Sequence, residues 1–185
     1  DEADTPDVDA LSFGDSVVDR PLSIVAWVQS DVTNALQYII AKENSNTAEE
    51  WRLQMTAGAE FQFVLTDEST SPAGIIAPRT SAAHLFDTSS HMWAATYDGS
   101  GVVTGCKLYK DGAAEGFGTF ADDSDGTYVA MENTAALVHL GARYTTKQGF
   151  WNGKMYCVLL VAKMLYPDEI WALKASGNAF WNLSL

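Results

Sequence analysis

The sequence predicts an all-β domain, a sandwich of two antiparallel sheets, and three observations support this. Apolar runs of strand length recur along the 185 residues, for example at 22–28 and 155–164. Asp-Gly and Asn-Gly pairs, which suit tight turns, stand between or beside the runs. One segment near the C-terminus has the marks of a short helix. Hairpins rather than crossovers are therefore expected to join the strands.

Each strand is predicted from its own pattern. Residues 22–28 and 38–42 are nearly continuous apolar runs, which indicate central strands. Residues 51–55 and 61–65 alternate apolar and polar side chains, as half-buried strands do. Further strands are expected at 91–97, 106–110, 137–140 and 155–164. The stretch 67–90 is rich in Ser, Thr, Pro and Gly and predicts a long loop with one short strand near residues 75 and 76.

The C-terminal helix is predicted to begin at Pro167, because proline suits the first helical position. Asp168 and Glu169 complement the helix dipole, and Gly177 can end the helix. The apolar residues 180–185 are expected to dock as a last strand. Contact with a neighbouring subunit is the alternative.

The chain divides into an acidic N-terminal arm or linker, residues 1–10, and one domain, residues 11–185. Five of the first ten residues are acidic, and they show no apolar period. A chain of this length with 47% apolar residues normally folds around one core when it is all-β. Cys106 and Cys157 lie inside predicted strands, so two buried free thiols are favoured over one disulfide.

The charge balance excludes some partners. Eleven Lys and Arg stand against 24 Asp and Glu, and the net charge of −13 opposes binding to nucleic acid or to an anionic membrane surface. No apolar run approaches the roughly 20 residues that a membrane helix needs, and the acidic start is unlike a signal peptide. The chain as given is expected to be soluble.

The order of several segments is characteristic, among them LSFGDSVVDRPLSIVAWV, HMWAATYDGSG, CKLYKDG and GFWNGKMYCVLL. Over about residues 11–175 the chain resembles the laminin-G-like, concanavalin A-like jelly-roll modules, a class that includes lectins and glucanases. The block 128–134, YVAMENT, looks like versions of the module found in phage and marine viral structural proteins. The resemblance implies two antiparallel sheets, a concave face or loop rim that binds glycans or proteins, and often one calcium ion.

Three functions are compatible with this resemblance. The first is a non-catalytic, lectin-like recognition or display module on a virion surface or another extracellular assembly, which binds glycans or a neighbouring virion or surface protein. The second is a purely structural decoration or assembly domain without a small-molecule ligand, and a homo-oligomer is possible. The third is a glycoside hydrolase.

The sequence favours a protein that is not an enzyme. A glycosidase needs two carboxylates about 5 to 9 Å apart across a groove, and no strand shows paired acids at the spacing that hydrolases of this fold carry. There is no Gly-x-Ser-x-Gly motif, and His84, His91 and His139 have no motif that ties them to a cysteine.

Calcium is the one cofactor that the residues suggest. Asp123, Asp125 and Glu132 fall on positions 3, 5 and 12 of an EF-hand-like loop, but its first position is Ala121, so a plain acidic turn is the alternative. Asp19 precedes the strand at 22–28, where the family often places a calcium-binding acid. A joint site would pair Asp19 with Glu132 or Asn133. The predicted metal ligands are Asp19, Asp123, Asp125, Glu132 and Asn133.

The predicted ligand-binding residues are Tyr144, Trp151 and Asn152. Sugar recognition uses an exposed aromatic ring beside amide and carboxylate groups. Trp151 precedes Asn152, and Tyr144 follows Arg143, each near a turn, so these side chains could form such a rim. Core packing is the alternative for both rings.

Overall fold

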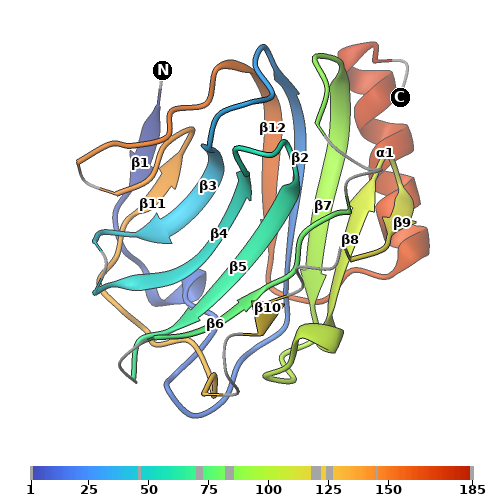
Figure 1. Ribbon diagram of the computed structural model, residues 1–185. Coiled ribbons are helices and arrows are strands. Elements are labelled where there is room, and N and C mark those ends of the chain that lie inside the picture. The colour runs from blue at the N-terminus through green and yellow to red at the C-terminus, as the bar shows by residue number, and fades with distance from the viewer. Residues whose placement is uncertain are drawn as a thin grey trace.

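The structure is a computed structural model that describes residues 2–45, 47–69, 73–81, 86–117, 122–123, 127–144 and 146–183, with residues 122 and 123 described by their backbone alone. The described strands form two antiparallel sheets, and one helix covers the outer side of one of them (Figure 1). The predicted all-β sandwich with one C-terminal helix is therefore confirmed.

The first sheet contains seven strands among the described residues. Their order is β1 (Ala3–Thr5), β11 (Val138–Leu140), β3 (Gln37–Glu43), β4 (Glu49–Met55), β5 (Phe61–Asp67), β6 (Gly74–Ala77) and β10 (Asp122–Asp123). Every neighbouring pair is antiparallel. The short strand expected near residues 75 and 76 is β6.

The second sheet contains five strands among the described residues. Their order is β12 (Gly153–Val161), β2 (Leu22–Ser30), β7 (Ser90–Tyr97), β8 (Cys106–Lys110) and β9 (Ala113–Glu115). All neighbours are again antiparallel, and β12 is an edge strand. Two short 3-10 helices, Asp9–Leu11 and Val103–Gly105, precede β2 and β8.

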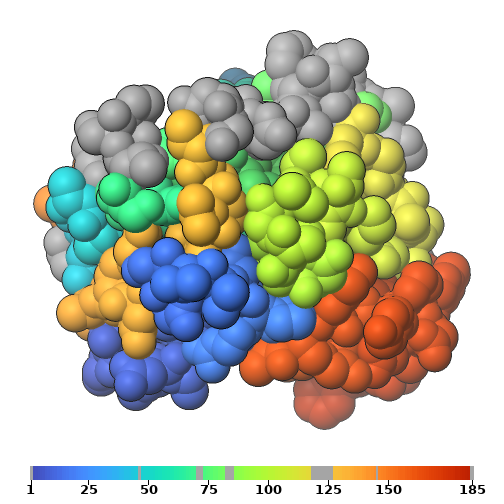
Figure 2. Space-filling view, turned by 90° about the horizontal axis from the view of Figure 1, so that it is seen from below, coloured from blue at the N-terminus to red at the C-terminus, as the bar shows by residue number. Residues whose placement is uncertain are grey.

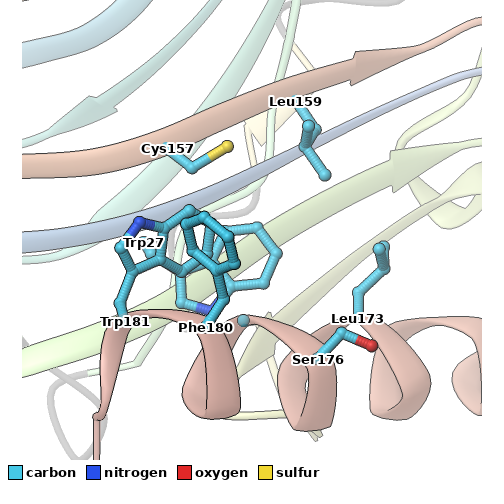
Figure 3. Close-up of a pocket in the computed structure, with 8 residues that line it drawn as sticks. Trp27, Cys157, Leu159, Leu173, Ser176, Phe180 and Trp181 are labelled. Atoms are coloured by element: carbon cyan, nitrogen blue, oxygen red, sulfur yellow. The ribbon is translucent and has the colours of Figure 1, made fainter.

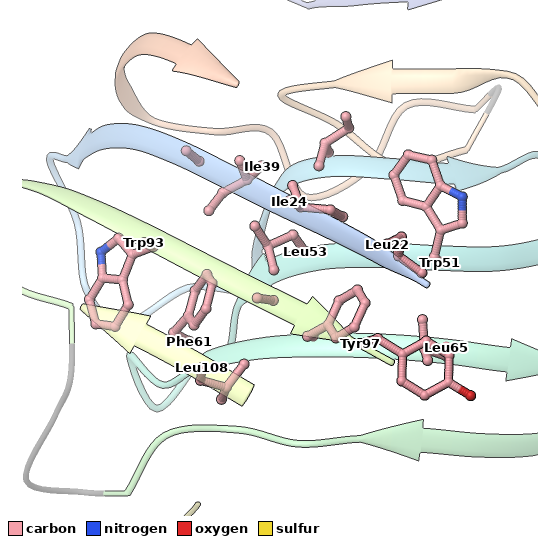
Figure 4. Packing of buried hydrophobic residues seen from close by; sticks show 14 of the residues in the cluster. Leu22, Ile24, Ile39, Trp51, Leu53, Phe61, Leu65, Trp93, Tyr97 and Leu108 are labelled. Atoms are coloured by element: carbon pink, nitrogen blue, oxygen red, sulfur yellow. The ribbon is translucent and has the colours of Figure 1, made fainter. Parts of the chain in front are cut away.

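The core lies between the two sheets (Figure 4). On β4, Trp51, Leu53 and Met55 are fully buried and alternate with polar residues that point the other way. Phe61 of β5 stacks on Trp93 of β7 with ring centroids 4.8 Å apart. The two-residue period predicted for β4 and β5 thus places their apolar side chains in the core.

Strand β2 is apolar on both of its faces. Ile24 and Ala26 belong to the core between the sheets. Val25 and Trp27 belong to a second apolar cluster, which includes Ile170 of the helix α1 (Pro167–Trp181). Because both faces are covered, a nearly continuous apolar sequence is what this position requires.

Helix α1 begins where the sequence predicts. Pro167 is its first residue, and the Tyr166 backbone N–H donates to Oε2 of Glu169 at 2.9 Å, which satisfies a donor at the start of the helix. Within the part of the chain that the structure describes, no helix is long and apolar enough to cross a membrane.

The end of α1 differs from the prediction. The helix continues through Gly177 to Trp181, and Asn182 ends it in the left-handed conformation with φ of 54°. Residues 180 and 181 are therefore helical and do not form a last strand. Gly177 is needed inside the helix because a Cβ there would lie 2.5 Å from the indole of Trp27. Trp181 packs on the same indole with ring centroids 5.3 Å apart.

The acidic arm is bound to the domain by its own residues. Residues 3–5 form the edge strand β1 on β11. Oδ1 of Asp4 lies 2.6 Å from Nδ1 of His139, and Oδ1 of Asp7 lies 2.7 Å from Nζ of the buried Lys42. The sequence predicts an arm or linker here, and in the structure residues 3–5 belong to the first sheet.

The two cysteines are free thiols on opposite faces of the second sheet. Cys106 of β8 is buried in the core, whereas Cys157 of β12 is half-buried in the cluster under α1. The favoured interpretation of two unbonded thiols agrees with this arrangement, although Cys157 is not fully buried.

Candidate functional site

Asp19 ties three distant segments together at the end of the sandwich where β2 begins. Its Oδ2 accepts hydrogen bonds from the hydroxyls of Tyr97 at 2.6 Å and Tyr128 at 2.7 Å. Its Oδ1 accepts one from the backbone N–H of Met131 at 2.9 Å. Burial raises the pKa of Asp19, and burial together with this carboxyl raises the pKa of both tyrosines. We call this arrangement the Asp19 clamp.

A cavity of about 420 Å³ lies beside the clamp, and we call it the loop-edge cavity. It is lined by Asp9, Ala10, Gly14, Asp15, Val18, Arg20 and Asn133. Figure 2 views this end of the molecule, where the N-terminal segment (blue) lies against the segment around residue 130 (amber) and the loop around residue 100 (lime). The clamp therefore fixes the segments that form the cavity.

The cavity presents carboxylate, amide and guanidinium groups together. Oδ1 of Asp15 accepts the backbone N–H groups of Val18 at 2.9 Å and Val17 at 3.0 Å, and these hydrogen bonds lower the pKa of this exposed carboxyl. The Arg20 guanidinium donates to a backbone carbonyl. The exposed Asn133 amide lies 3.5 Å from a carboxylate oxygen of Asp9. The lining can thus both donate and accept hydrogen bonds at neutral pH.

The two described carboxylates of the predicted calcium set accept hydrogen bonds from the protein itself. Asp19 binds the donors of the clamp, while Oε2 of Glu132 accepts the backbone N–H of Glu68 at 2.6 Å. Burial raises the pKa of Glu132, and a hydrogen bond with the Asp67 carboxyl raises it further. Both carboxylates thus have protein donors in this structure, and a joint calcium site stays a prediction.

The remaining members of that set do not complete a metal site in the described chain. Asn133 lines the loop-edge cavity, and the backbone of Asp123 pairs with Ile76 in the first sheet. The side chain of Asp123 and all of Asp125 lie outside the described residues. No group of three or more His, Cys, Asp or Glu among the described residues could hold a metal ion. Calcium binding by the predicted residues stays a prediction.

The predicted aromatic rim is not an open platform. Trp151 is 8% exposed, and its Nε1 donates to the Gln29 carbonyl at 3.2 Å. Tyr144 is 7% exposed, and the Arg143 guanidinium lies 3.8 Å from its ring centroid. Both rings pack inside the domain, because a position near a turn does not by itself keep a large ring in solvent.

Asn152, the third predicted ligand residue, does have an exposed side chain. Its carbonyl accepts the backbone N–H of Asp31 at 2.8 Å, just after the last residue of β2. Asn152 and Asn133 therefore lie at opposite ends of the sandwich, since the Asp19 clamp is at the start of β2. The predicted ligand residues and metal residues do not form one site.

Sequence reasoning missed a pair of carboxylates that pairing of β3 with β4 brings together. Glu43 and Glu49 are register partners, and Nη1 of Arg52 lies 2.6 Å from Glu43 and 3.1 Å from Glu49. Arg143 also donates to both. The register of the hairpin was the information that the sequence lacked. Both carboxylates are engaged by guanidinium groups, and the Glu43 side chain is fully buried.

The family model for concanavalin A-like lectins and glucanases matches residues 5–171. The chain belongs to this superfamily. The laminin-G-like, concanavalin A-like resemblance seen in the sequence is therefore confirmed. No curated protein sequence matches the chain.

Solved structures of binding domains share this lectin-like fold. The sialidase carbohydrate-binding module CBM40 of Ruminococcus gnavus, bound to α2,3-sialyllactose, superposes with a TM-score of 0.60 at 17% identity over 86% of this chain and 84% of the module. The binding domain of botulinum neurotoxin serotype D gives a TM-score of 0.61 at 14% identity and covers 95% of this chain but 40% of the toxin chain.

A further toxin domain, from botulinum neurotoxin DC in complex with rat synaptotagmin II, gives a TM-score of 0.56 at 15% identity over 85% of this chain and 36% of that one. At such identities these likenesses establish the fold alone.

We expect the lectin-like domain to be more stable in mild acid than at neutral pH. Burial raises the carboxyl pKa values of Asp19, Glu43, Glu50 and Glu132, so the folded state binds these protons more tightly than the unfolded chain. Their contribution is full below the unfolded values, 3.8 for Asp and 4.5 for Glu, and is lost as the pH rises through the folded values.

A carboxyl with a lowered pKa, such as that of Asp67, stabilises the folded state at neutral pH. This contribution is lost only as the pH falls below about 3.8. A lower pH also reduces the net charge of −13. The weaker repulsion between like charges then stabilises the folded state, as protonation of the buried acids does. Calorimetry should give a Tm at about pH 5 that exceeds the Tm at about pH 8 by at least 2–4 °C. A Tm that rises steadily with pH would contradict this account of the buried acids.

Proposed function

We propose that this domain is a non-catalytic glycan-binding module and that the loop-edge cavity is its binding site. Membership of the superfamily supports the proposal, as do the binding domains of similar fold, one bound to sialyllactose and one to synaptotagmin II. The observation that carries it is the cavity itself, which gathers carboxylate, amide and guanidinium groups on segments that the Asp19 clamp holds.

The lining matches the chemistry of a sugar. Sugar hydroxyls can donate to the carboxylates of Asp9 and Asp15 and accept from the guanidinium of Arg20, and the amide of Asn133 can do both. Val18, whose side chain is 57% exposed, supplies an apolar contact for the C–H groups of a pyranose ring. The clamp holds the loops in place before a ligand binds. Binding therefore loses less conformational entropy.

The charge of the site favours neutral glycans over sialylated ones. Two carboxylates and one guanidinium line the cavity, and the whole chain carries a net charge of −13. A sialic acid would bring a further negative charge into this field, which disfavours binding. We therefore assign neutral saccharides as the ligand class, unlike the sialyllactose bound by the CBM40 module.

The acids of the cavity and of the Glu43–Glu49 pair support binding without catalysis. A glycosidase uses one carboxylic acid that carries a proton and one free carboxylate. In the cavity, Asp15 has a lowered pKa and so holds no proton at neutral pH. On the first sheet, Glu43 and Glu49 are occupied by Arg52 and Arg143. The chemistry of these groups supports recognition rather than hydrolysis.

A display role on a virion surface or another extracellular assembly completes the proposal. Its viral part rests on the resemblance of residues 128–134 to viral modules. A structural decoration domain would be favoured if the acidic arm and the apolar tail were buried against neighbouring subunits. Of these segments, β1 pairs with β11 and Trp181 packs on Trp27 within the same chain (Figure 3), whereas Phe180 is 81% exposed. The contacts of β1 and Trp181 support recognition.

Two exposed amides provide a matched test. Asn133→Ala removes an amide from the cavity, whereas Asn152→Ala removes one at the opposite end of the sandwich. For the best-bound neutral saccharide, calorimetric titration should show an affinity loss of about tenfold for Asn133→Ala, the value of one or two hydrogen bonds, and no change for Asn152→Ala. The reverse pattern would move the site to the Asn152 end and overturn this assignment.

A further inference from the structure

The amine of Lys42 on β3 is buried between two carboxyls. Its Nζ lies 2.7 Å from Oδ1 of Asp7 and 3.2 Å from Oε1 of Glu50, and the side chains of Lys42 and Glu50 are both fully buried. The same nitrogen donates to the Ala136 carbonyl at 2.7 Å. We call Lys42, Asp7 and Glu50 the buried triad. It contains an amine and a carboxyl, which are the reactants of an amide bond, and a second carboxyl that can relay protons.

Asp7 is fixed against Lys42 by contacts on both sides of it in the chain. Before Asp7, β1 pairs with β11, whose Val138 is the register partner of Lys42. After Asp7, the Leu11 carbonyl accepts the Nε1–H of the buried Trp51 at 2.9 Å. Because the fold already holds the two groups in contact, most of the entropy cost of joining them is met before any reaction.

The two carboxyls differ as a reactant and a proton relay should. Oε1 of Glu50 accepts the backbone N–H of Thr134 at 2.8 Å and the hydroxyl of Ser12 at 3.2 Å, so this carboxyl is held in place. Its Oε2 is buried and has no hydrogen-bond partner among the described residues. Burial raises the pKa of Glu50, which therefore accepts a proton more readily than an exposed glutamate does. The Asp7 side chain is 27% exposed, so water formed there can leave.

We propose that Lys42 and Asp7 form an intramolecular isopeptide bond, with Glu50 as the proton relay, and that the ion-paired triad in the structure is its precursor. One proton passes from Nζ to the Asp7 carboxylate along their hydrogen bond, which leaves a neutral amine and a carboxylic acid. The nitrogen lone pair forms a C–N bond to Cγ of Asp7, and the bond from Cγ to the hydroxyl oxygen breaks with its electron pair on that oxygen. Glu50 takes a second proton from the nitrogen and passes it to the same oxygen, which leaves as water.

The reaction is favoured by the burial of the triad. A buried ammonium and a partly buried carboxylate have lost solvation energy, whereas the amide that replaces them carries no charge. The one N–H that remains on Nζ can keep the hydrogen bond to the Ala136 carbonyl. The bond ties the acidic arm covalently to the first sheet. The triad shares no residue with the loop-edge cavity, so this inference does not depend on the glycan proposal.

Mass spectrometry of the intact wild-type domain tests the proposal. The folded protein should be lighter than its sequence by the mass of one water molecule, and a chymotryptic digest should contain a branched peptide that joins residue 7 to residue 42. Chymotrypsin cuts after large apolar residues, and Phe13 and Tyr38 lie between the two positions, so a complete digest keeps them together only if they are bonded. Full mass with no branched peptide would overturn the proposal.

Variants assign the role of each carboxyl. Asp7→Ala, which lacks the reacting group, and Glu50→Gln, which lacks the relay, should both keep their full mass. Asp7→Asn should lose ammonia in place of water, because its amide nitrogen is then the leaving group. Glu2→Ala is the matched control, since Glu2 is another acid of the arm and lies 3.5 Å from the amine of the partly exposed Lys147, and it should still lose one water. Loss of water that persists in Asp7→Ala or in Glu50→Gln would overturn the assignment.

Discussion

Replacing Lys42 with methionine is expected to cost about 3–5 kcal/mol of unfolding free energy. The Lys42 side chain is fully buried, and its Nζ lies 3.2 Å from Oε1 of Glu50 and 2.7 Å from Oδ1 of Asp7. The same Nζ donates to the Ala136 carbonyl at 2.7 Å. Without the ammonium group, the buried Glu50 carboxylate has no counter-ion. Denaturant titration by circular dichroism measures the loss.

The double variant Lys42→Met with Glu50→Gln should recover much of this loss, because the uncompensated charge is then removed. Lys154→Met, at an exposed position on β12, is the control and should change stability by no more than about 0.5 kcal/mol. A loss below about 1 kcal/mol for Lys42→Met would mean that the ion pair does not hold the arm and the first sheet together.

Replacing Asp19 with alanine is expected to cost at least about 3 kcal/mol, because three buried or half-buried donors lose their acceptor and each costs about 1–3 kcal/mol. These donors are the hydroxyls of Tyr97 and Tyr128 and the backbone N–H of Met131. The loss should also loosen the loop-edge cavity and lower glycan affinity. Denaturant titration checks the first effect and calorimetric titration the second.

Asp31→Ala is the matched control for this change. Asp31 is an exposed aspartate just after β2, whereas Asp19 is a half-buried aspartate just before β2. Combining Asp19→Ala with Tyr97→Phe should cost less than the sum of the two single changes, because both remove the same hydrogen bond. Strict additivity of the two would show that the clamp contributes nothing as a unit.

Strand patterns made the sandwich predictable, whereas the short strands β1, β9 and β10 escaped prediction. The alternating runs at 51–55 and 61–65 correspond to β4 and β5, since side-chain period and burial coincide there. Strand β1 is three residues long and carries an acid, so only its pairing with β11 reveals it. The helix end was wrong for a related reason: Gly177 is required by a contact with Trp27, 150 residues earlier in the chain.

The candidate site could be predicted in part. The sequence directed attention to Asp19 and Asn133, and both lie at the end of the sandwich that carries the loop-edge cavity. It could not show that Tyr97 and Tyr128 occupy the Asp19 carboxylate, because those residues are 78 and 109 positions away. Nor could it distinguish a buried ring from an exposed one at Trp151.

Binding of the wild-type domain to an array of neutral and sialylated glycans tests the proposed function most directly. The account predicts that neutral saccharides bind and that their sialylated counterparts bind more weakly, because the cavity and the whole chain are acidic. An array on which no glycan binds, or on which only sialylated glycans bind, would contradict the assignment of the loop-edge cavity as a neutral-glycan site.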